Sequence, residues 1–427
     1  MAAAATYEKV SFLNIPDDVS FSILSKLPLK SLKRFTCVQK SWSLLLQNPY
    51  FMNMFRTNLL VSKHDEHDDN MCILLKEMKA YENQDTLCTL SGKSFENRVR
   101  LDWPPPLQGV DSYIRIWGTA SVNGILCLSQ GFLDPITIVL WNPATGEFKV
   151  VPRSRRPPNV EFNSYPFSFG YDRIKDDYKV IRLVDFRQYF EDTWVCLPEK
   201  NSPFWEMDVD SDDDDDDNDN DFWEGVPIDM YDPYWEIYTL KSNSWKKLDG
   251  IDRHAAWNDR CEVNLNEWSH WLGLNNDMVS FDFSNESFFV TTLPSFDFSK
   301  ETSYEGISSF LDLKRRHLQR NLVVLNGSVA FICTVLKTAY FHIWVLGELG
   351  VKESWTKLFV VGPLPYIMRP IAVGLKGDIF YIKEDKELAC FDLSTQRIVD
   401  VGIKEDRAWL QIVIYKKNLC SFRGINN

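Results

Sequence analysis

The sequence predicts an α+β multidomain protein, in which a small N-terminal helical module is followed by an all-β propeller of roughly six blades. Three observations lead to this fold class. Residues 13–53 follow a helical period, whereas most of the remaining chain consists of short apolar runs separated by Gly, Asn, Asp and Pro. Two turn-centred sequence patterns also recur along this second part, as expected of a repeated structural unit.

The N-terminal module is predicted to begin with a helix that follows Pro16. Val19, Ile23 and Leu27 recur at helical spacing, and Pro28 should end this first helix. Further apolar residues continue a helical face beyond Pro28. A segment of about forty residues can bury only part of this apolar surface, so we expect the module to be completed by a partner.

The same segment resembles the F-box. The resemblance rests on Ile15-Pro16, Val19, Ile23-Leu24, Leu27-Pro28, Leu32, Arg34-Phe35, Cys37-Val38, Lys40-x-Trp42 and Asn48-Pro49-x-Phe51. An F-box is a helical module that docks on a Skp-type adaptor and through it on a cullin ubiquitin ligase. The resemblance implies an adaptor-facing or interface-shaping set of Ile15, Pro16, Val19, Ile23, Leu24, Leu27, Pro28, Leu32, Val38 and Trp42. Alternatively, these side chains form a helical hairpin packed on the rest of the chain.

The first repeated pattern in the second part is a strand, a polar turn, an aromatic residue in most copies, and a second strand. Its copies lie at 138–148, 237–245, 279–288, 343–355 and 389–397. Each copy is typical of a β-hairpin, because two apolar runs flank a short turn.

The second repeated pattern is a tight turn in which Asn or Lys precedes Gly. It occurs at 123–124, 326–327 and 376–377, and a weaker copy at Asn266 has Glu267 in place of the glycine. Asn-Gly between strands favours a hairpin because both central residues must take a positive φ. Two hairpins make four strands, which is one propeller blade.

A propeller ring must close, so its last strands should pair with early ones. We expect residues 409–415 and 419–422 to pair with the segments around 72–75 and 86–90. Residues 95–405 resemble the F-box-associated, kelch-like region of plant F-box proteins, as in the S-locus F-box and F-box-kelch-repeat group. The kelch double glycine is mostly absent, so a standard kelch array is not predicted.

These patterns divide the chain into an F-box at 10–56, a connector with possible closing strands at 57–94, and an F-box-associated propeller at 95–427. An acidic insertion at 200–227 interrupts the propeller and is predicted to be disordered. It is interpreted as a solvated loop, with a docking arm for a basic partner or a weak divalent-cation binder as alternatives. Its Asp and Glu residues account for most of the net charge of −13, so the remainder is nearly neutral and favours no nucleic-acid partner.

Composition also limits the compartment. The nine cysteines include no C-x-x-C pair, which is typical of reduced thiols in a cytoplasmic and/or nuclear protein. The first ten residues, MAAAATYEKV, lack the basic start and apolar stretch of a secretory signal. The apolar stretch 322–336 is too short to span a bilayer, so no membrane association is expected.

No catalytic residue, metal site or cofactor is predicted. The sequence has neither the clustered Cys and His ligands of a RING nor an activated cysteine environment. His64 and His67 are interpreted as loop residues and His270 as a packed histidine. Two basic clusters are possible contacts for an acidic or phosphorylated partner, although we interpret them as solvated: Arg153, Arg155 and Arg156; Lys314, Arg315, Arg316 and Arg320.

The resemblance therefore implies a non-catalytic substrate-recognition subunit of a cullin-type SCF ubiquitin ligase. The F-box would dock on a Skp-type adaptor, and the propeller would bind a protein substrate whose identity and contact residues are unknown. One alternative is an interaction scaffold that binds the adaptor without promoting ubiquitination. Another is a β-propeller enzyme, which would need His or carboxylate side chains converging on one cavity.

Overall fold

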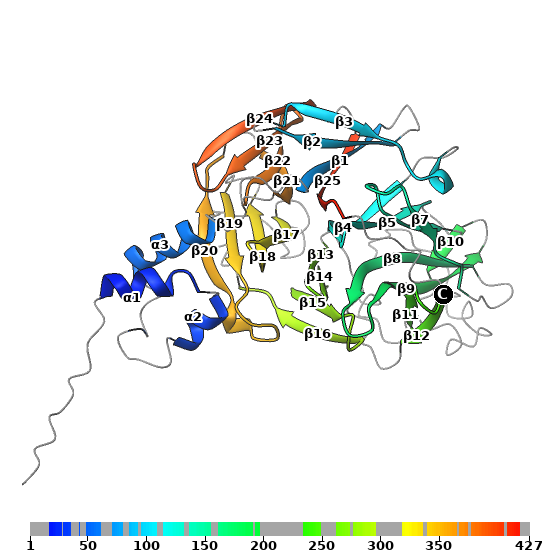
Figure 1. The fold of residues 1–427 in the computed structure, drawn as a ribbon, viewed down its shortest axis with the longest axis horizontal. Helices are drawn as coiled ribbons and strands as arrows, with labels where there is room; N and C mark the ends of the chain where they lie inside the picture. Colours follow the sequence, from blue (N-terminus) through cyan, green and yellow to red (C-terminus); the bar gives the residue numbers. More distant parts are fainter. Residues whose placement is uncertain are drawn as a thin grey trace, which may run out of the picture.

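The protein is described by a computed structural model that is mostly β. The described residues are 17–27, 29–35, 42, 48–60, 71–79, 85–92, 95–108, 114–131, 136–154, 161–190, 193–196, 234–248, 262–273, 276–295, 318–335, 340–364, 367–374, 377–404 and 408–418. Its sheets are arranged around a common centre, and the helices lie outside this ring beside β19 and β20 (Figure 1). The predicted propeller is therefore confirmed.

The described residues of the N-terminal part form three α-helices: α1 (Asp17–Leu24), α2 (Leu29–Phe35) and α3 (Pro49–Leu60). Helix α3 was not predicted as a separate element, although its start has clear signals. Asn48 Oδ1 accepts hydrogen bonds from the backbone N–H groups of Tyr50 and Phe51, at 3.0 and 3.1 Å. Asn at this position and Pro immediately after it are typical of a helix N-terminus. Among the described residues, no helix is both long and apolar enough to cross a membrane.

The described strands form six antiparallel blades, numbered here in chain order from the closing blade. Blade 1 contains β25 (Ala408–Lys416), β1 (Met71–Lys79), β2 (Asp85–Ser91) and β3 (Asn97–Leu101). Blade 2 contains β4 (Ile114–Val122), β5 (Ile125–Gln130), β6 (Thr137–Trp141) and β7 (Phe148–Val150). Blade 3 contains β8 (Glu161–Asp172), β9 (Asp177–Phe190), β11 (Tyr234–Thr239) and β12 (Ser244–Leu248), with the short β10 (Thr193–Cys196) along β9.

The other three blades follow the same meander. Blade 4 contains β13 (Val263–Leu265), β14 (Trp268–Leu272), β15 (Asp277–Asp282) and β16 (Ser287–Thr292). Blade 5 contains β17 (Leu318–Leu325), β18 (Ser328–Val335), β19 (Tyr340–Val345) and β20 (Thr356–Val361). Blade 6 contains β21 (Ile367–Val373), β22 (Ile379–Lys383), β23 (Glu387–Asp392) and β24 (Arg397–Lys404). Two short 3-10 helices, η3 (Pro105–Leu107) and η9 (Lys352–Ser354), lie in connections.

The ring closes through blade 1, which combines one strand from the end of the propeller sequence with three from its beginning. Strand β25 pairs with β1 in an antiparallel register that places Tyr415 opposite Cys72, and β1 pairs with β2. This confirms the predicted closure for residues 409–415, whereas 419–422 lie outside the described residues. A parallel bridge between Ile414 and Ala120 joins blade 1 to blade 2.

Two of the predicted Asn-Gly turns form where the sequence places them; of the third, Lys376 lies outside the described residues and Gly377 has a φ of 82°. Asn123 and Gly124 have φ values of 52° and 81°, and Asn326 and Gly327 have 46° and 73°. The weaker copy also makes a hairpin, between β13 and β14, with Asn266 at a φ of 57°. Asn tolerates this conformation better than most residues, so the turn forms although Glu267 replaces the glycine.

Six apolar clusters hold the blades together, one between each pair of neighbours around the ring. Between blades 3 and 4, for example, the rings of the fully buried Trp235 and Trp271 lie 5.9 Å apart. Between blades 6 and 1, Arg98 also donates hydrogen bonds to the carbonyl oxygens of Val401 and Gly402. Because each blade is packed on both faces, the described strands form a closed ring with a continuous core.

Candidate functional site

The N-terminal helices carry the residues that sequence reasoning assigned to adaptor binding. Val19, Ile23, Leu24, Leu27, Leu32 and Trp42 are among the described residues, whereas Ile15, Pro16, Pro28 and Val38 lie outside them. The described members of the set do not share one environment. Some are exposed, some are buried in the chain itself, and the difference assigns them different roles.

Val19 and Ile23 form an exposed apolar stripe on α1. Their side chains lie one helical turn apart and are 44% and 56% exposed. Tyr50, at the start of α3, is 64% exposed, and its ring lies 6.4 Å from that of Phe21 on α1. Sequence reasoning missed Tyr50, although it occupies the unspecified position of the Asn48-Pro49-x-Phe51 motif. We call Val19, Ile23 and Tyr50 the outer apolar face.

Leu24 and Leu32 have the opposite placement, since they are 4% and 0% exposed. On α1 the buried side is formed by Ser20 and Leu24 rather than by the predicted stripe of Val19 and Ile23. Direct contact of Leu24 or Leu32 with a separate protein would require the helices to open. These two residues are therefore placed to shape the module, and their packing matches the alternative in which the helices pack on the rest of the chain.

Leu27 and Trp42 are half-buried at the edge of the same packed region. The Trp42 ring meets the Phe35 ring edge to face at 5.8 Å, which ties the residue to the end of α2. Such positions can contribute to both the module's packing and an outside contact, because part of each side chain remains accessible.

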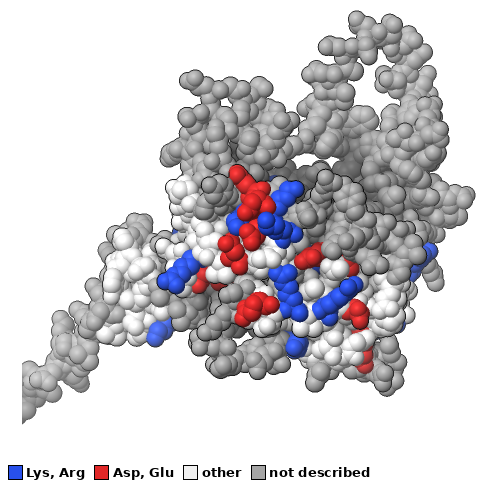
Figure 2. Space-filling model, turned by 90° about the horizontal axis from the view of Figure 1, so that it is seen from above, with Lys and Arg blue, Asp and Glu red and all other residues white. Residues whose placement is uncertain are grey.

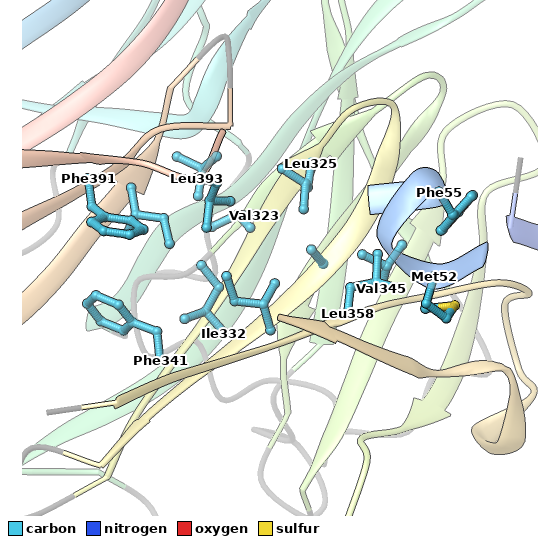
Figure 3. Packing of buried hydrophobic residues seen from close by; sticks show 14 of the residues in the cluster. Met52, Phe55, Val323, Leu325, Ile332, Phe341, Val345, Leu358, Phe391 and Leu393 are labelled. Carbon is cyan, nitrogen blue, oxygen red and sulfur yellow. The ribbon is translucent and has the colours of Figure 1, made fainter. Parts of the chain in front are cut away.

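The helices rest on blade 5. Phe51, Met52 and Phe55 of α3 share one continuous buried apolar cluster with residues of blades 5 and 6. Figure 3 shows Met52 and Phe55 beside Val345 of β19 and Leu358 of β20. At the rim of this contact, Arg34 and Glu348 approach to 3.8 Å with both side chains largely exposed, so their ion pair contributes little.

A buried polar group lies near the centre of the ring. Glu262, immediately before the inner strand β13, accepts a hydrogen bond from Ser269 Oγ at 3.2 Å, and Ser168 Oγ donates to Ser269 Oγ at 2.5 Å. Burial raises the pKa of Glu262 to about 7, although these hydroxyls and the charge of Arg115 oppose the rise. The carboxyl group therefore keeps its proton to a higher pH than an ordinary glutamate does, and it joins blade 3 to blade 4 through hydrogen bonds.

His270 is a packed histidine, as interpreted from the sequence. It is 2% exposed, and its Nδ1 lies 2.8 Å from Ser280 Oγ. Burial lowers its pKa to about 3, so the ring is neutral at physiological pH. The described residues contain no group of three or more His, Cys, Asp or Glu side chains that could hold a metal ion.

Charged side chains of both signs are interspersed on the face seen in Figure 2. Among the described ion pairs, Lys383 Nζ lies 2.9 Å from Glu387 Oε2 and 3.0 Å from Asp400 Oδ1. Of the basic clusters, Arg153 is exposed and Arg320 donates a hydrogen bond to Asn276 at 3.4 Å. The other members of the basic clusters lie outside the described residues: Arg155, Arg156, Lys314, Arg315 and Arg316. The acidic insertion and the pair His64 and His67 also lie outside them.

Comparison with known families identifies the family to which the ring belongs. The family profile of the F-box associated beta propeller domain matches residues 71–423, which begin at β1 and extend beyond β25. The chain belongs to this family. It is thus a plant-type F-box protein with an F-box associated β-propeller, and the kelch-like resemblance is confirmed at the family level.

Curated relatives of this F-box protein extend over nearly its whole length. The F-box protein CPR1 of Arabidopsis thaliana is 23% identical over 417 residues, which cover 92% of this chain and 85% of the relative. The F-box/kelch-repeat protein At3g23880 of Arabidopsis thaliana is 22% identical, covering 92% of this chain and 91% of the relative. The similarity therefore extends beyond the residues matched by the propeller family.

Proposed function

We propose that this F-box protein is the substrate-recognition subunit of a cullin-type SCF ubiquitin ligase. The observation that carries the proposal is the outer apolar face, since Val19, Ile23 and Tyr50 stay exposed although other apolar residues of the module are buried. Exposed apolar side chains on adjoining helices suit a groove on a partner protein. The partner in this proposal is a Skp-type adaptor, which links the chain to a cullin.

The mechanism is proximity rather than chemistry within this chain. A substrate held on the propeller is kept near a ubiquitin-charged conjugating enzyme, so its effective concentration there rises. The ring suits this role, because loops on a rigid scaffold can vary without disturbing the blades. Among the described cysteines, Cys127 and Cys390 are buried thiols outside any disulfide, which supports a reducing cytoplasmic and/or nuclear location.

Adaptor binding is tested with the full-length chain and a purified plant Skp-type adaptor, by isothermal titration calorimetry. Ile23→Asp should weaken binding by about 100-fold, because a carboxylate buried in an apolar contact loses its hydration. Ile174→Asp is the matched control, since Ile174 is 77% exposed in the turn between β8 and β9. Equal binding by both variants and the unchanged chain would remove the outer apolar face from the proposal.

The ubiquitination output needs its own test, because an interaction scaffold would bind the adaptor equally well. Proximity labelling with the full chain identifies proteins that contact it, and their abundance is then followed with and without proteasome inhibition. A substrate receptor predicts targets that accumulate under inhibition only when Ile23 is unchanged. If target abundance changes neither with proteasome inhibition nor with Ile23→Asp, the chain would instead be an interaction scaffold that does not promote ubiquitination.

A further inference from the structure

The N-terminal helices are too short to hold themselves together. Helices α1, α2 and α3 contain 8, 7 and 12 residues, and isolated helices of this length are marginal in water. The contacts between the helices include an aromatic pair and a hydrogen bond. Phe21 meets Phe51 edge to face at 5.4 Å, and Asn58 Nδ2 donates to Ser25 Oγ at 2.7 Å. The arrangement needs further apolar surface from outside the helices.

Blade 5 supplies that surface. The buried residues of α3 and those of β19 and β20 belong to one cluster, and Figure 3 shows Met52 on the side of α3 where Val345 and Leu358 lie. Exposure falls to 6% for Met52, 2% for Phe55 and 1% for Leu358. Val360 on the same strand is 54% exposed. A register shift between Ile343 and Trp344 leaves Leu358 as an extra residue of β20, so Leu358 and Val360 point to different faces although they are two residues apart.

We propose that blade 5 holds the N-terminal helices in their adaptor-binding shape, with Met52, Phe55, Val345 and Leu358 as positioning residues. The adaptor part of this inference rests on the proposed function. If the helices are ordered only while docked, the apparent dissociation constant for the adaptor equals the intrinsic value divided by the docked fraction. Substitutions in blade 5 would then weaken adaptor binding, although the substituted residues do not contact the adaptor.

The same contact sets the geometry of the complex. Because α3 packs on β19 and β20 rather than hanging on a free linker, the outer apolar face keeps one orientation relative to the ring. An adaptor bound there and a substrate bound on the ring would be separated by a defined distance. Release of α3 would lose both the affinity and this orientation.

The test uses the full-length chain with Met52→Asp, Leu358→Asn and the matched control Val360→Asn. Hydrogen exchange of residues 17–24 and 49–60 reports whether the helices are held, and exchange in the other blades reports whether the ring is intact. Calorimetry with the adaptor gives the dissociation constant. Met52→Asp and Leu358→Asn should speed helix exchange and raise the dissociation constant about tenfold, as a docked fraction near one tenth requires. Val360→Asn should change neither.

Leu358→Asn could disturb the ring itself, since Leu358 belongs to β20. Met52→Asp still tests the contact in that case, because Met52 belongs to α3 and not to the ring. Faster helix exchange with an unchanged dissociation constant would overturn the inference, since the adaptor would then order the helices by itself. Unchanged helix exchange in Met52→Asp would overturn it as well. Absence of adaptor binding by the unchanged chain would refute the proposed function, and helix exchange would still decide whether blade 5 holds the helices.

Discussion

Apolar side chains are buried more completely between blades 3 and 4 than in the N-terminal helices. Trp271 is enclosed between blades, with Trp235 and Phe288 as ring neighbours at 5.9 Å each. Helix α1 buries only its Ser20 and Leu24 side and leaves Val19 and Ile23 in solvent. A blade is packed on two faces by its neighbours, whereas the module is packed on one. The module therefore depends on blade 5 for part of its packing and leaves a face for a partner.

The largest expected effect comes from breaking the ring core. Trp271→Ala should lower the free energy of unfolding by about 3 to 5 kcal/mol, because a fully buried indole leaves a cavity. Urea denaturation followed by tryptophan fluorescence measures the loss. Trp268→Ala removes the same side chain from a half-buried site beside Phe289 and should cost only about 1 kcal/mol. Equal losses would show that blades 3 and 4 are not tightly packed.

A smaller effect is expected in the pH dependence of stability, to which the buried Glu262 contributes. The folded state raises the pKa of Glu262 from 4.5 to about 7, so it binds more protons than the unfolded state in this interval. Stability should fall as pH rises from 4.5 to 7, by up to about 3 kcal/mol from this group.

Glu262→Gln should remove that part of the pH dependence, as measured by thermal unfolding at several pH values. The exposed Glu384→Gln is the control and should leave the pH profile unchanged. A profile that stays the same in Glu262→Gln would contradict a raised pKa at the centre of the ring. The pH-sensitive part of stability would then have to come from elsewhere in the chain.

The smallest expected effect lies in the helical module. Asn48→Ala removes the side-chain acceptor at the start of α3 and should destabilise that helix by about 1 kcal/mol. Hydrogen exchange at the first turn of α3 should quicken, while the unfolding midpoint of the ring stays unchanged. A matching drop in the ring's midpoint would show that module and ring unfold as one unit, and the contrast between them would disappear.

Local chemistry explains why much of the ring could be predicted. Tight turns are predicted by only two residues each at Asn123-Gly124 and Asn326-Gly327. The apolar runs on either side of each turn then predict a hairpin. Ring closure was also predictable, because an apolar strand at 409–415 needs a partner edge. Blade 3 was harder to predict, since its β9 and β11 are separated by the acidic insertion.

The adaptor site was predicted less completely. The motif identified the right helices, but it could not separate exposed from buried members. Ile23 and Leu24 are adjacent in sequence and equally apolar, yet they point to opposite environments at 56% and 4% exposure. Neighbouring residues on a helix differ by about 100° in direction, so a wide apolar stripe leaves its buried side undecided.

The sequence by itself thus determined the turns, the repeated hairpins and the family to which the chain belongs, because these depend on residues close together in the chain. Only the tertiary structure decided that blade 5 receives α3, that Val19 and Ile23 face outward, and that Glu262 is buried enough to hold a proton near neutral pH. Each of these depends on separate elements of the chain meeting in space. The burial that results is a property of the packed fold, and no local pattern encodes it.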